Sequence, residues 1–181
     1  DLFYEELSEE IIFKALDKMM EYNWHKYLIL TKREKIMKEI VDKYCEARNL
    51  KILPDFIWLG VSVEDNKRAA LRLPYLRDTK CSVRFVSCEP LLEEVDFSTY
   101  PIMDWYIAGG ESVEKGFDPN NARPFDVNWA RKIRDFCKEA GVAFHMKQIG
   151  CNPVNAVTSP RHKWRGFSFY TSIANLLFSI Q

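Results

Sequence analysis

Ile57-Trp58-Leu59-Gly60-Val61-Ser62-Val63 is a continuous, largely apolar run that ends in the acidic pair Glu64-Asp65. A short apolar run without regular polar alternation is typical of a strand that is covered on both faces of a parallel sheet. We therefore predict a buried strand here, with charged residues placed directly after its carboxyl end.

Apolar runs of the same form occur on both sides of this stretch. They lie at residues 27–31, 83–87, 104–108 and 142–146. Helical apolar stripes separate the runs, at residues 8–20, 36–45, 66–77 and 126–140. Ser8 and Asp126 are the expected N-caps of the first and last helices, and Gly141 is the expected stop of the last. This alternation of strands and helices predicts an α/β fold with right-handed crossovers.

The expected architecture is a parallel partial TIM-like barrel, because a complete barrel typically needs about 250 residues and this chain has 181. An open doubly wound sheet is the alternative. We interpret Asp1–Phe3 as a short strand stub, residues 1–150 as the partial barrel domain, and residues 151–181 as a C-terminal tail that packs or docks.

The composition excludes several classes of protein. The chain is 47% hydrophobic, and its 26 basic and 26 acidic residues cancel, which argues against intrinsic disorder and against a generic nucleic-acid coat protein. No run approaches the roughly 18 apolar residues of a membrane span, so we expect no membrane partner.

The five cysteines, at positions 45, 81, 88, 137 and 151, do not have the close spacing of a metal-binding knuckle. We therefore expect reduced and mostly buried thiols, no metal ligands among them, and a cytoplasmic location. Cys88 in particular is interpreted as a buried thiol.

Polar residues follow each predicted strand. Because the carboxyl ends of parallel strands meet at one rim, where α/β proteins bind ligands, these residues are expected to share one opening. The candidates chosen on this basis are Thr31, Lys32, Arg33, Ser62, Glu64, Ser87, Glu89, Gly109, Gly110, Glu111, Ser112, Lys147 and Gln148.

Each candidate also has a simpler interpretation. A glutamate after a strand caps the next helix or pairs with a surface lysine about as often as it binds a ligand. Gly109-Gly110 fits a tight turn that needs positive φ, or exposed backbone N–H groups for an anion. Lys147, assisted by Glu89 or Glu111, fits an aldolase-type Schiff base if its amine is desolvated.

Several motifs occur in a fixed order, namely Trp58-Leu59-Gly60-Val61-Ser62-Val63-Glu64, Arg84-Phe85-Val86-Ser87-Cys88-Glu89-Pro90-Leu91, Trp105-Tyr106-Ile107-Ala108-Gly109-Gly110-Glu111-Ser112, Ala122-Arg123-Pro124 and Lys147-Gln148. Together they resemble a family of phage and bacterial proteins of unknown function that carry an N-terminal three-cysteine motif. That family is similar to radical S-adenosylmethionine enzymes, which use a partial parallel barrel.

The resemblance implies S-adenosylmethionine and a [4Fe–4S] cluster as cofactors, with the cluster held by three cysteines upstream of Asp1. This chain alone is expected to bind neither. The resemblance also adds Arg123 to the candidate ligand-binding residues and implies an anionic substrate, such as a nucleotide or nucleic acid.

Two functions follow as hypotheses. The first is the body of a radical-SAM-like enzyme with its ligand at the rim of strand ends. The second is a non-catalytic phage accessory domain that binds a protein or nucleic acid through the rim and the C-terminal tail, where Arg161–Arg165 forms a compact basic and aromatic cluster.

Overall fold

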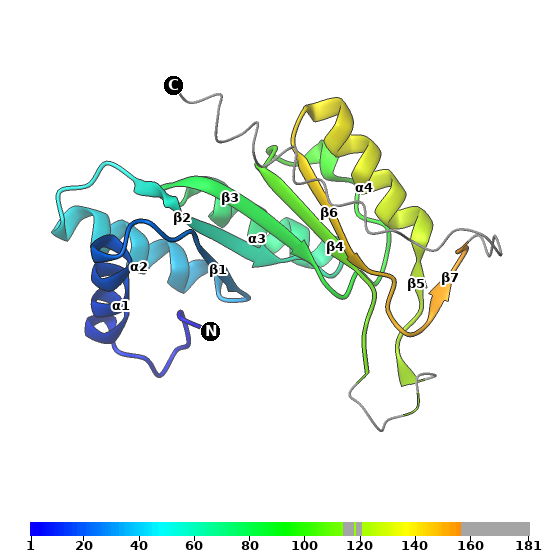
Figure 1. The fold of residues 1–181 in the computed structure, drawn as a ribbon, viewed down its shortest axis with the longest axis horizontal. Helices are drawn as coiled ribbons and strands as arrows, with labels where there is room; N and C mark the ends of the chain where they lie inside the picture. Colours follow the sequence, from blue (N-terminus) through cyan, green and yellow to red (C-terminus); the bar gives the residue numbers. More distant parts are fainter. Residues whose placement is uncertain (114–117, 119–120, 157–181) are drawn as a thin grey trace.

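The computed structural model of the chain describes residues 1–113, 118 and 121–156. Its elements follow one another as α1 (Glu9–Glu21), β1 (Tyr27–Thr31), α2 (Glu34–Ala47), β2 (Leu53–Ser62), α3 (Asn66–Asp78), β3 (Cys81–Cys88), the 3₁₀ turn η1 (Phe97–Thr99), β4 (Trp105–Gly109), β5 (Phe125–Asp126), α4 (Val127–Ala140), β6 (Ala143–Gln148) and β7 (Pro153–Val154). Figure 1 shows these elements along the chain. The predicted alternation of strands and helices is confirmed.

The main sheet has five parallel strands in the order β1-β2-β3-β4-β6, which is also their order in the chain. A doubly wound sheet reverses its strand order at a switch point, and this order contains no reversal. The doubly wound alternative is therefore wrong. The described residues form an open, all-parallel sheet, and its sequential strand order is compatible with the predicted partial barrel.

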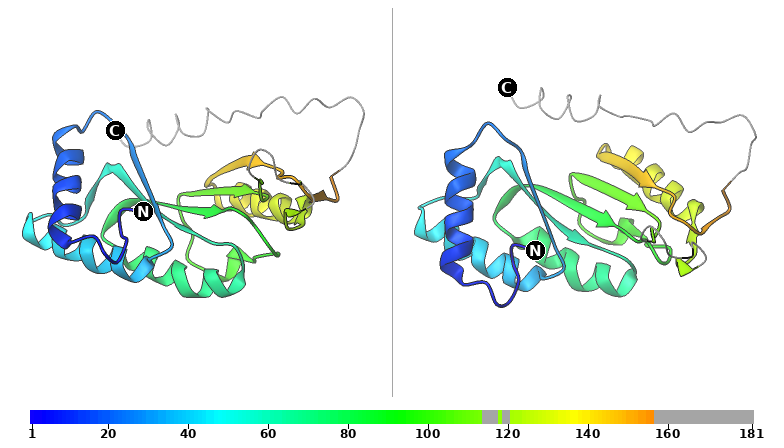
Figure 2. Two further views of the ribbon diagram at one scale, coloured as in Figure 1. Left: turned by 90° about the horizontal axis from the view of Figure 1, so that it is seen from below. Right: turned by 60° about the horizontal axis from the view of Figure 1, so that its bottom comes forward.

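This winding places the helices on one face of the sheet, because right-handed crossovers that all step in the same direction lie on the same side. Both views in Figure 2 show α2 and α3 on the same side of the strands. Ile12, Met37, Leu73 and Ile133, one from each helix, join a single hydrophobic core with the strand residues that point toward the helices.

The opposite face of the sheet, called here the inner face, has a second and smaller apolar cluster. Trp58, Val83 and Phe85 are buried there, and Trp105 and Ile107 pack against them. Gly60 lies directly beside the Phe85 ring, since a Cβ at this position would come within 2.5 Å of ring atoms. The glycine thus leaves the space in which the ring lies across the sheet.

The predicted helix ends of α1 and α4 are confirmed. The Ser8 hydroxyl accepts a hydrogen bond from the Ile11 amide, and the Asp126 carboxylate accepts one from the Asn128 amide. Gly141 ends α4 at φ 71°, in the left-handed region that glycine adopts without strain.

The two ends of the described chain are held by different contacts. Asp1–Phe3 is a turn rather than a strand stub, because Asp1 caps its own backbone by accepting a hydrogen bond from the Phe3 amide at 3.0 Å. At the other end, β7 pairs in parallel with β5, so residues 151–156 attach to the body of the domain. Residues 157–181, including the basic cluster Arg161–Arg165, lie outside the described residues.

All five cysteines are free, and Cys45, Cys81, Cys88 and Cys137 are buried. The expectation of reduced, mostly buried thiols is confirmed, as is the burial of Cys88. Among the helices of the described residues, none combines the length and the apolar composition that crossing a membrane requires.

Candidate functional site

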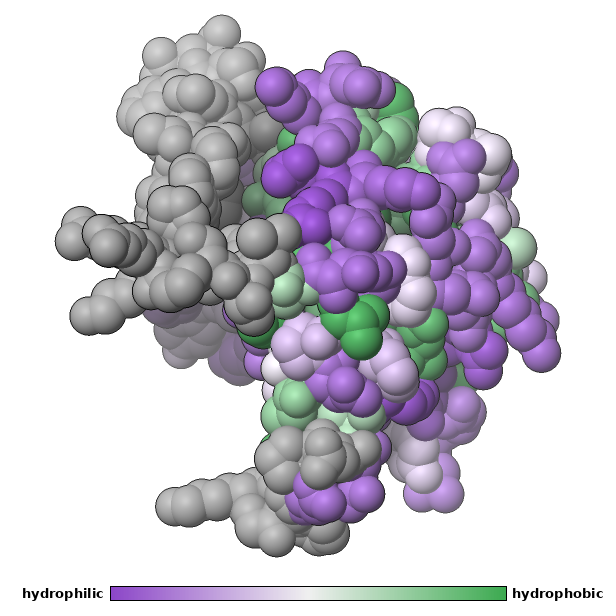
Figure 3. Space-filling view, turned by 90° about the vertical axis from the view of Figure 1, so that its right-hand side faces the viewer, coloured by the Kyte–Doolittle hydropathy of each residue, from purple (hydrophilic) through white to green (hydrophobic). Residues whose placement is uncertain are grey.

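The carboxyl ends of the five parallel strands meet on one side of the molecule, toward the right of Figure 1. The register aligns Ser62 with Ser87, Ser87 with Ile107, and Ile107 with His145 in one row across the sheet. The residues just after this row form the rim. Seen from this side, the surface that is not grey is predominantly hydrophilic (Figure 3).

Glu64 is the centre of one group of charges at the rim. Its Oε1 lies 2.6 Å from the amine of Lys32, and its Oε2 lies 2.8 Å from Nη1 of Arg72. The same nitrogen of Arg72 donates to the Ser62 carbonyl at 2.7 Å. Glu34, at the start of α2, lies 3.6 Å from Nε of Arg72 on its other side. Arg72 therefore connects two buried carboxylates.

The surroundings of Glu64 favour its charged form. Burial acts to raise its pKa, but the hydrogen bond from Lys32 and the positive charges of Arg72 and Lys32 outweigh burial, so the pKa is lowered. Glu64 is thus a buried carboxylate that stays ionised.

Glu89 is the centre of a second group of charges. Its Oε2 accepts a hydrogen bond from the Ser87 hydroxyl at 3.0 Å. Its Oε1 is buried, accepts no hydrogen bond within the described residues, and lies 3.3 Å from the Lys147 amine. The Lys147 side chain is 57% exposed, whereas that of Glu89 is 16% exposed. The Lys147 amine also donates a hydrogen bond to Glu89 Oε2 at 3.4 Å. A buried acceptor therefore lies beneath an exposed cation.

Gly109 leaves open space beside Glu89. A Cβ at position 109 would stand 2.9 Å from Glu89 Oε1 and 3.4 Å from Gln148. Any larger residue would therefore crowd this carboxylate oxygen.

The backbone holds the two groups of charges next to each other. The Leu92 amide donates to the Glu64 carbonyl, and the Leu91 amide donates to the Gly109 carbonyl. The segment after Glu89 therefore lies between the ends of β2 and β4. We call these residues together the rim cluster: Lys32, Ser62, Glu64, Ser87, Glu89, Gly109 and Lys147.

Glu111 forms a separate pair with Arg123. Both carboxylate oxygens of Glu111 accept from the guanidinium, at 2.9 and 2.5 Å, and the Arg123 amide donates to it at 2.8 Å. The hydrogen bonds from the Arg123 side chain and backbone lower the pKa of Glu111 to about 2. Glu111 is therefore committed to organising the loop, parts of which (residues 114–117, 119 and 120) lie outside the described residues.

Gly109 and Gly110 do not adopt positive φ, since the positive-φ glycines of the described residues are Gly141 and Gly150. Of the two interpretations of this pair, the tight turn with positive φ is wrong. Gly110 is required instead for a close approach of two chains, because a Cβ there would lie 2.5 Å from the Ile149 carbonyl. The Gly110 amide donates a hydrogen bond to the Gln148 carbonyl, and the Gly110 carbonyl accepts one from the Gln148 side chain. Two hydrogen bonds therefore link Gly110 to Gln148.

Thr31 and Arg33 belong to a different group, at the start of the described chain. The Asp1 carboxylate accepts from the Thr31 hydroxyl at 2.8 Å and from Arg33 at 2.9 Å. Arg33 also pairs with Glu5 and lies over the Tyr4 ring. The structure thus brings Thr31 and Arg33 to the N-terminal turn, and it leaves Ser112 exposed.

Two residues of the site do not follow a strand and were not among the sequence candidates. Arg72 and Glu34 are both buried charges on helices. A signal for Arg72 exists in the sequence, because it shares a helical face with the apolar Ala69 and Leu76 at spacings of three and four residues. An arginine on such a face indicates a buried partner.

Metal ligation is not supported within the described residues, where no group of three or more His, Cys, Asp or Glu side chains has a suitable arrangement. Burial raises the pKa of the Cys81 and Cys137 thiols to about 12, and it also raises the pKa of Cys45 and Cys88. Iron–sulfur clusters need thiolates. The described cysteines therefore do not fit a cluster.

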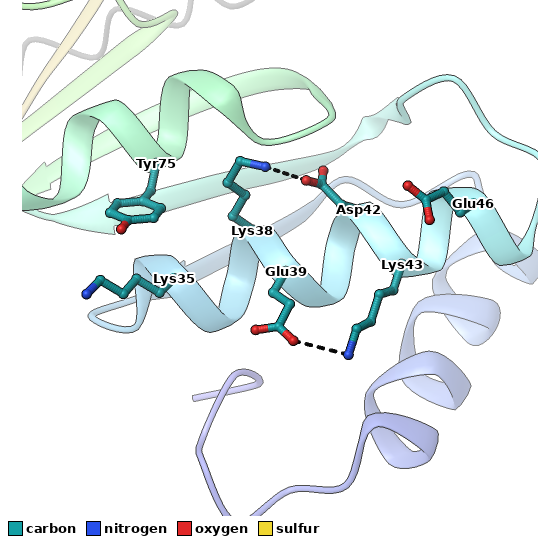
Figure 4. A pocket seen from close by; sticks show the side chains of 7 residues that line it. All are labelled: Lys35, Lys38, Glu39, Asp42, Lys43, Glu46 and Tyr75. Carbon is teal, nitrogen blue, oxygen red and sulfur yellow. Dashed lines mark hydrogen bonds and ion pairs between the residues drawn. The ribbon is translucent and has the colours of Figure 1, made fainter.

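A hollow of about 450 Å³ lies on the helix layer rather than at the strand ends (Figure 4). Four of its charged residues pair with one another, Lys38 with Asp42 and Lys43 with Glu39. Lys35 lies over the ring of Tyr75. This arrangement is that of a solvated, ion-paired helix surface.

Comparison with known proteins identifies a family but no activity. No curated protein and no solved structure matches the chain. A family model described as a protein of unknown function, DUF5131, matches residues 1–170. Since this match covers nearly the whole sequence, the chain belongs to the DUF5131 family of proteins of unknown function.

Proposed function

We propose that this chain binds a small organic ligand at the rim cluster, and that the ligand carries both an anionic group and hydrogen-bond donors. The observation that carries the proposal is Glu89 Oε1, a buried acceptor that lacks a hydrogen bond within the described residues and lies beneath the exposed Lys147. The Lys147 amine pairs with this oxygen by charge but makes no hydrogen bond to it, so a donor on a ligand can supply the hydrogen bond that the buried oxygen lacks.

The two residues suit different parts of one ligand. The exposed Lys147 side chain can turn toward an anionic group, such as a phosphate or carboxylate. Glu89 is then free to accept from a hydroxyl or ammonium of the same ligand. Charge-assisted hydrogen bonds of both kinds are stronger than neutral ones.

The place of the site supports a function of enzyme type. Ligand sites of parallel α/β enzymes lie at the carboxyl ends of the strands, where residues from several strands converge. The rim cluster draws on β2, β3, β4 and β6 and on the residue after β1. An aldolase-type role of Lys147 lacks support, because the lysine is solvated and lies against Glu89.

The resemblance to radical S-adenosylmethionine enzymes makes S-adenosylmethionine one ligand to test. Lys147 suits its carboxylate, and Glu89 suits its ammonium. When bound with a cluster, this cofactor supplies radical chemistry. The described cysteines do not fit the cluster, so the proposal concerns binding alone.

Isothermal titration calorimetry tests the proposal with ribose 5-phosphate and, separately, with S-adenosylmethionine. We expect at least one of them to bind, and Lys147→Met to weaken that binding roughly tenfold to a hundredfold, the loss of one charged hydrogen bond. The control is Lys51→Met, since Lys51 is exposed and precedes β2 at the opposite end of the sheet.

Two results contradict the proposal. One is the absence of binding by both compounds. The other is an equal loss of affinity in the Lys51 and Lys147 variants, which would indicate a non-specific charge effect rather than a site.

A non-catalytic domain that binds a protein or nucleic acid is the second candidate. It is favoured by Leu28 and Leu30, two exposed apolar residues on the edge strand β1. A chain that ends at Ala156 keeps the β5–β7 pairing and removes the rest of the tail. If the second function is correct, the full chain binds a labelled single-stranded oligonucleotide and the chain that ends at Ala156 does not.

A further inference from the structure

We infer that the inner face of the sheet, just before the rim cluster, is a subsite for a nucleobase, so that the ligand is a mononucleotide. This inference rests on the proposed function and names the class of its ligand. The subsite consists of Trp105, Ile107 and His145, which we call the aromatic floor.

The aromatic floor is the open border of an otherwise buried aromatic cluster. The Trp105 ring packs at 5.8 Å from the Phe85 ring and at 6.0 Å from the Trp58 ring. Phe85 and Trp58 are buried, whereas Trp105 and Ile107 are half-buried. His145 is exposed and lies 6.4 Å from Trp105 between ring centroids. The helix layer lies on the other face, so among the described residues these side chains are open to the inner side.

Flat aromatic groups fit this surface. Nucleobases stack on tryptophan and histidine rings, and this stacking tolerates any base because each has a π-face. The floor is held rigid from behind by the buried Trp58 and Phe85, which reduces the entropy lost when a base binds.

The spacing between the floor and the rim cluster fits one nucleotide. His145 and Lys147 lie two residues apart on β6, about 7 Å along an extended strand. The register with β4 shifts at Lys147, and both side chains are exposed on either side of the half-buried Met146. Across the sheet, Ile107 and His145 share a row with Ser87, and Glu89 is two residues beyond Ser87. A base on the floor therefore places the ribose hydroxyls near Glu89 and the phosphate near Lys147.

Charge favours a mononucleotide over a nucleic-acid strand. Strand binding needs a continuous row of cations along the phosphate backbone. The chain has 26 basic and 26 acidic residues, and the cations of the rim cluster alternate with Glu64 and Glu89. One phosphate group can pair with a single lysine here, but a nucleic-acid strand would also be repelled by the neighbouring carboxylates.

Calorimetric titration with AMP and with ribose 5-phosphate tests the inference, because AMP carries adenine at the C1 position where ribose 5-phosphate carries a hydroxyl. We expect AMP to bind about tenfold more tightly to the full chain, in line with one stacked base. Trp105→Leu should remove this difference while leaving the affinity for ribose 5-phosphate unchanged. Trp24→Leu is the control, since Trp24 is 68% exposed and lies before β1.

His145→Ala provides a second variant in case Trp105→Leu disturbs packing, since the exposed His145 contributes little to the core. It should weaken AMP binding and leave ribose 5-phosphate binding unchanged. Quenching of tryptophan fluorescence by AMP, absent with ribose 5-phosphate, is the expected independent signal.

The outcomes separate the two proposals. Equal binding of AMP and ribose 5-phosphate overturns the nucleobase subsite and leaves the rim site standing. Absence of binding by AMP, ribose 5-phosphate and S-adenosylmethionine overturns the proposed function as well. A hexa-adenylate strand that binds more than tenfold more tightly than AMP overturns the mononucleotide assignment.

Discussion

Glu111 and Glu64 are held in their charged forms in different ways. Glu111 is near the surface and owes its low pKa to hydrogen bonds from Arg123 alone. Glu64 is buried, and two cations offset the effect of burial on its pKa. The first arrangement orders a loop, and the second keeps a charge at the proposed ligand site.

Glu111→Gln should destabilise the fold by about 1 kcal/mol at neutral pH, the upper range for a surface ion pair. The pKa of Glu111 falls from an ordinary value of 4.5 to about 2 in the folded chain. Its stabilising effect is therefore complete above pH 4.5 and is lost as the pH falls toward 2.

Urea unfolding of the wild type and the Glu111 variant at several values between pH 7 and pH 3 measures this effect. The difference in unfolding free energy should shrink as the pH is lowered. The exposed Glu6→Gln serves as a control. A difference for Glu111→Gln that is constant over this range would contradict the assigned role of its charge.

At the residue scale, the sequence predicted which polar residues follow the strands but not which of them share contacts. Glu64 with Lys32 and Glu89 with Lys147 lie together, whereas Thr31 and Arg33 turn toward Asp1. The direction of a side chain after a strand depends on the loop that follows it. Strand periodicity does not describe that loop.

At the scale of elements, β2 and β3 are joined by an unusual contact of Gly60 with the Phe85 ring. Gly60→Ala should destabilise the protein by roughly 1–3 kcal/mol, because the added methyl overlaps the ring and the core must shift. Combining it with Phe85→Leu should recover part of this loss. Urea unfolding of the two single variants and the double variant measures the coupling.

Gly141→Ala is a useful comparison for this pair. Position 141 has open space around it but a positive φ, so its cost comes from backbone strain and should not be relieved by Phe85→Leu. If Gly60→Ala is as stable as the wild type, the close approach of the ring to the backbone is not a packing constraint.

Helix and strand positions were predictable where the pattern is long. The strand β1 and the caps of α1 and α4 agree with the sequence-based expectation. The β5–β7 pair was missed because two-residue strands carry no periodic signal. The stub at Asp1–Phe3 was wrong because an aspartate side chain can replace strand pairing with a local turn.

At the scale of the whole molecule, the buried thiols report on the integrity of the helix-side core. In the native protein at pH 8, a thiol reagent should label Cys151 rapidly and the four buried cysteines only as the chain unfolds. Their raised pKa values strengthen this contrast.

Ellman's reagent measures this directly by absorbance. One rapid equivalent is expected for the wild type, none for Cys151→Ser, and five for the wild type in concentrated urea. More than one rapid equivalent would show that the core opens more readily than the structure indicates.

The overall architecture followed from the sequence as far as a parallel α/β sheet, since five apolar runs separated by helices allow little else. The family of unknown function was also predictable, from motifs at the strand ends, and the match over residues 1–170 supports it. Strand order was not predictable with certainty, because periodicity contains no information on the direction of each crossover.

The one-sided helix layer has a thermodynamic consequence. The helices cover the core on one face of the sheet only. A ligand that binds to the aromatic floor on the other face therefore adds apolar contacts that the protein alone does not make. Melting temperature should then rise with the concentration of the occupant, since only the native chain offers this surface. The affinity for the ligand and the rise in melting temperature therefore both measure the same binding equilibrium.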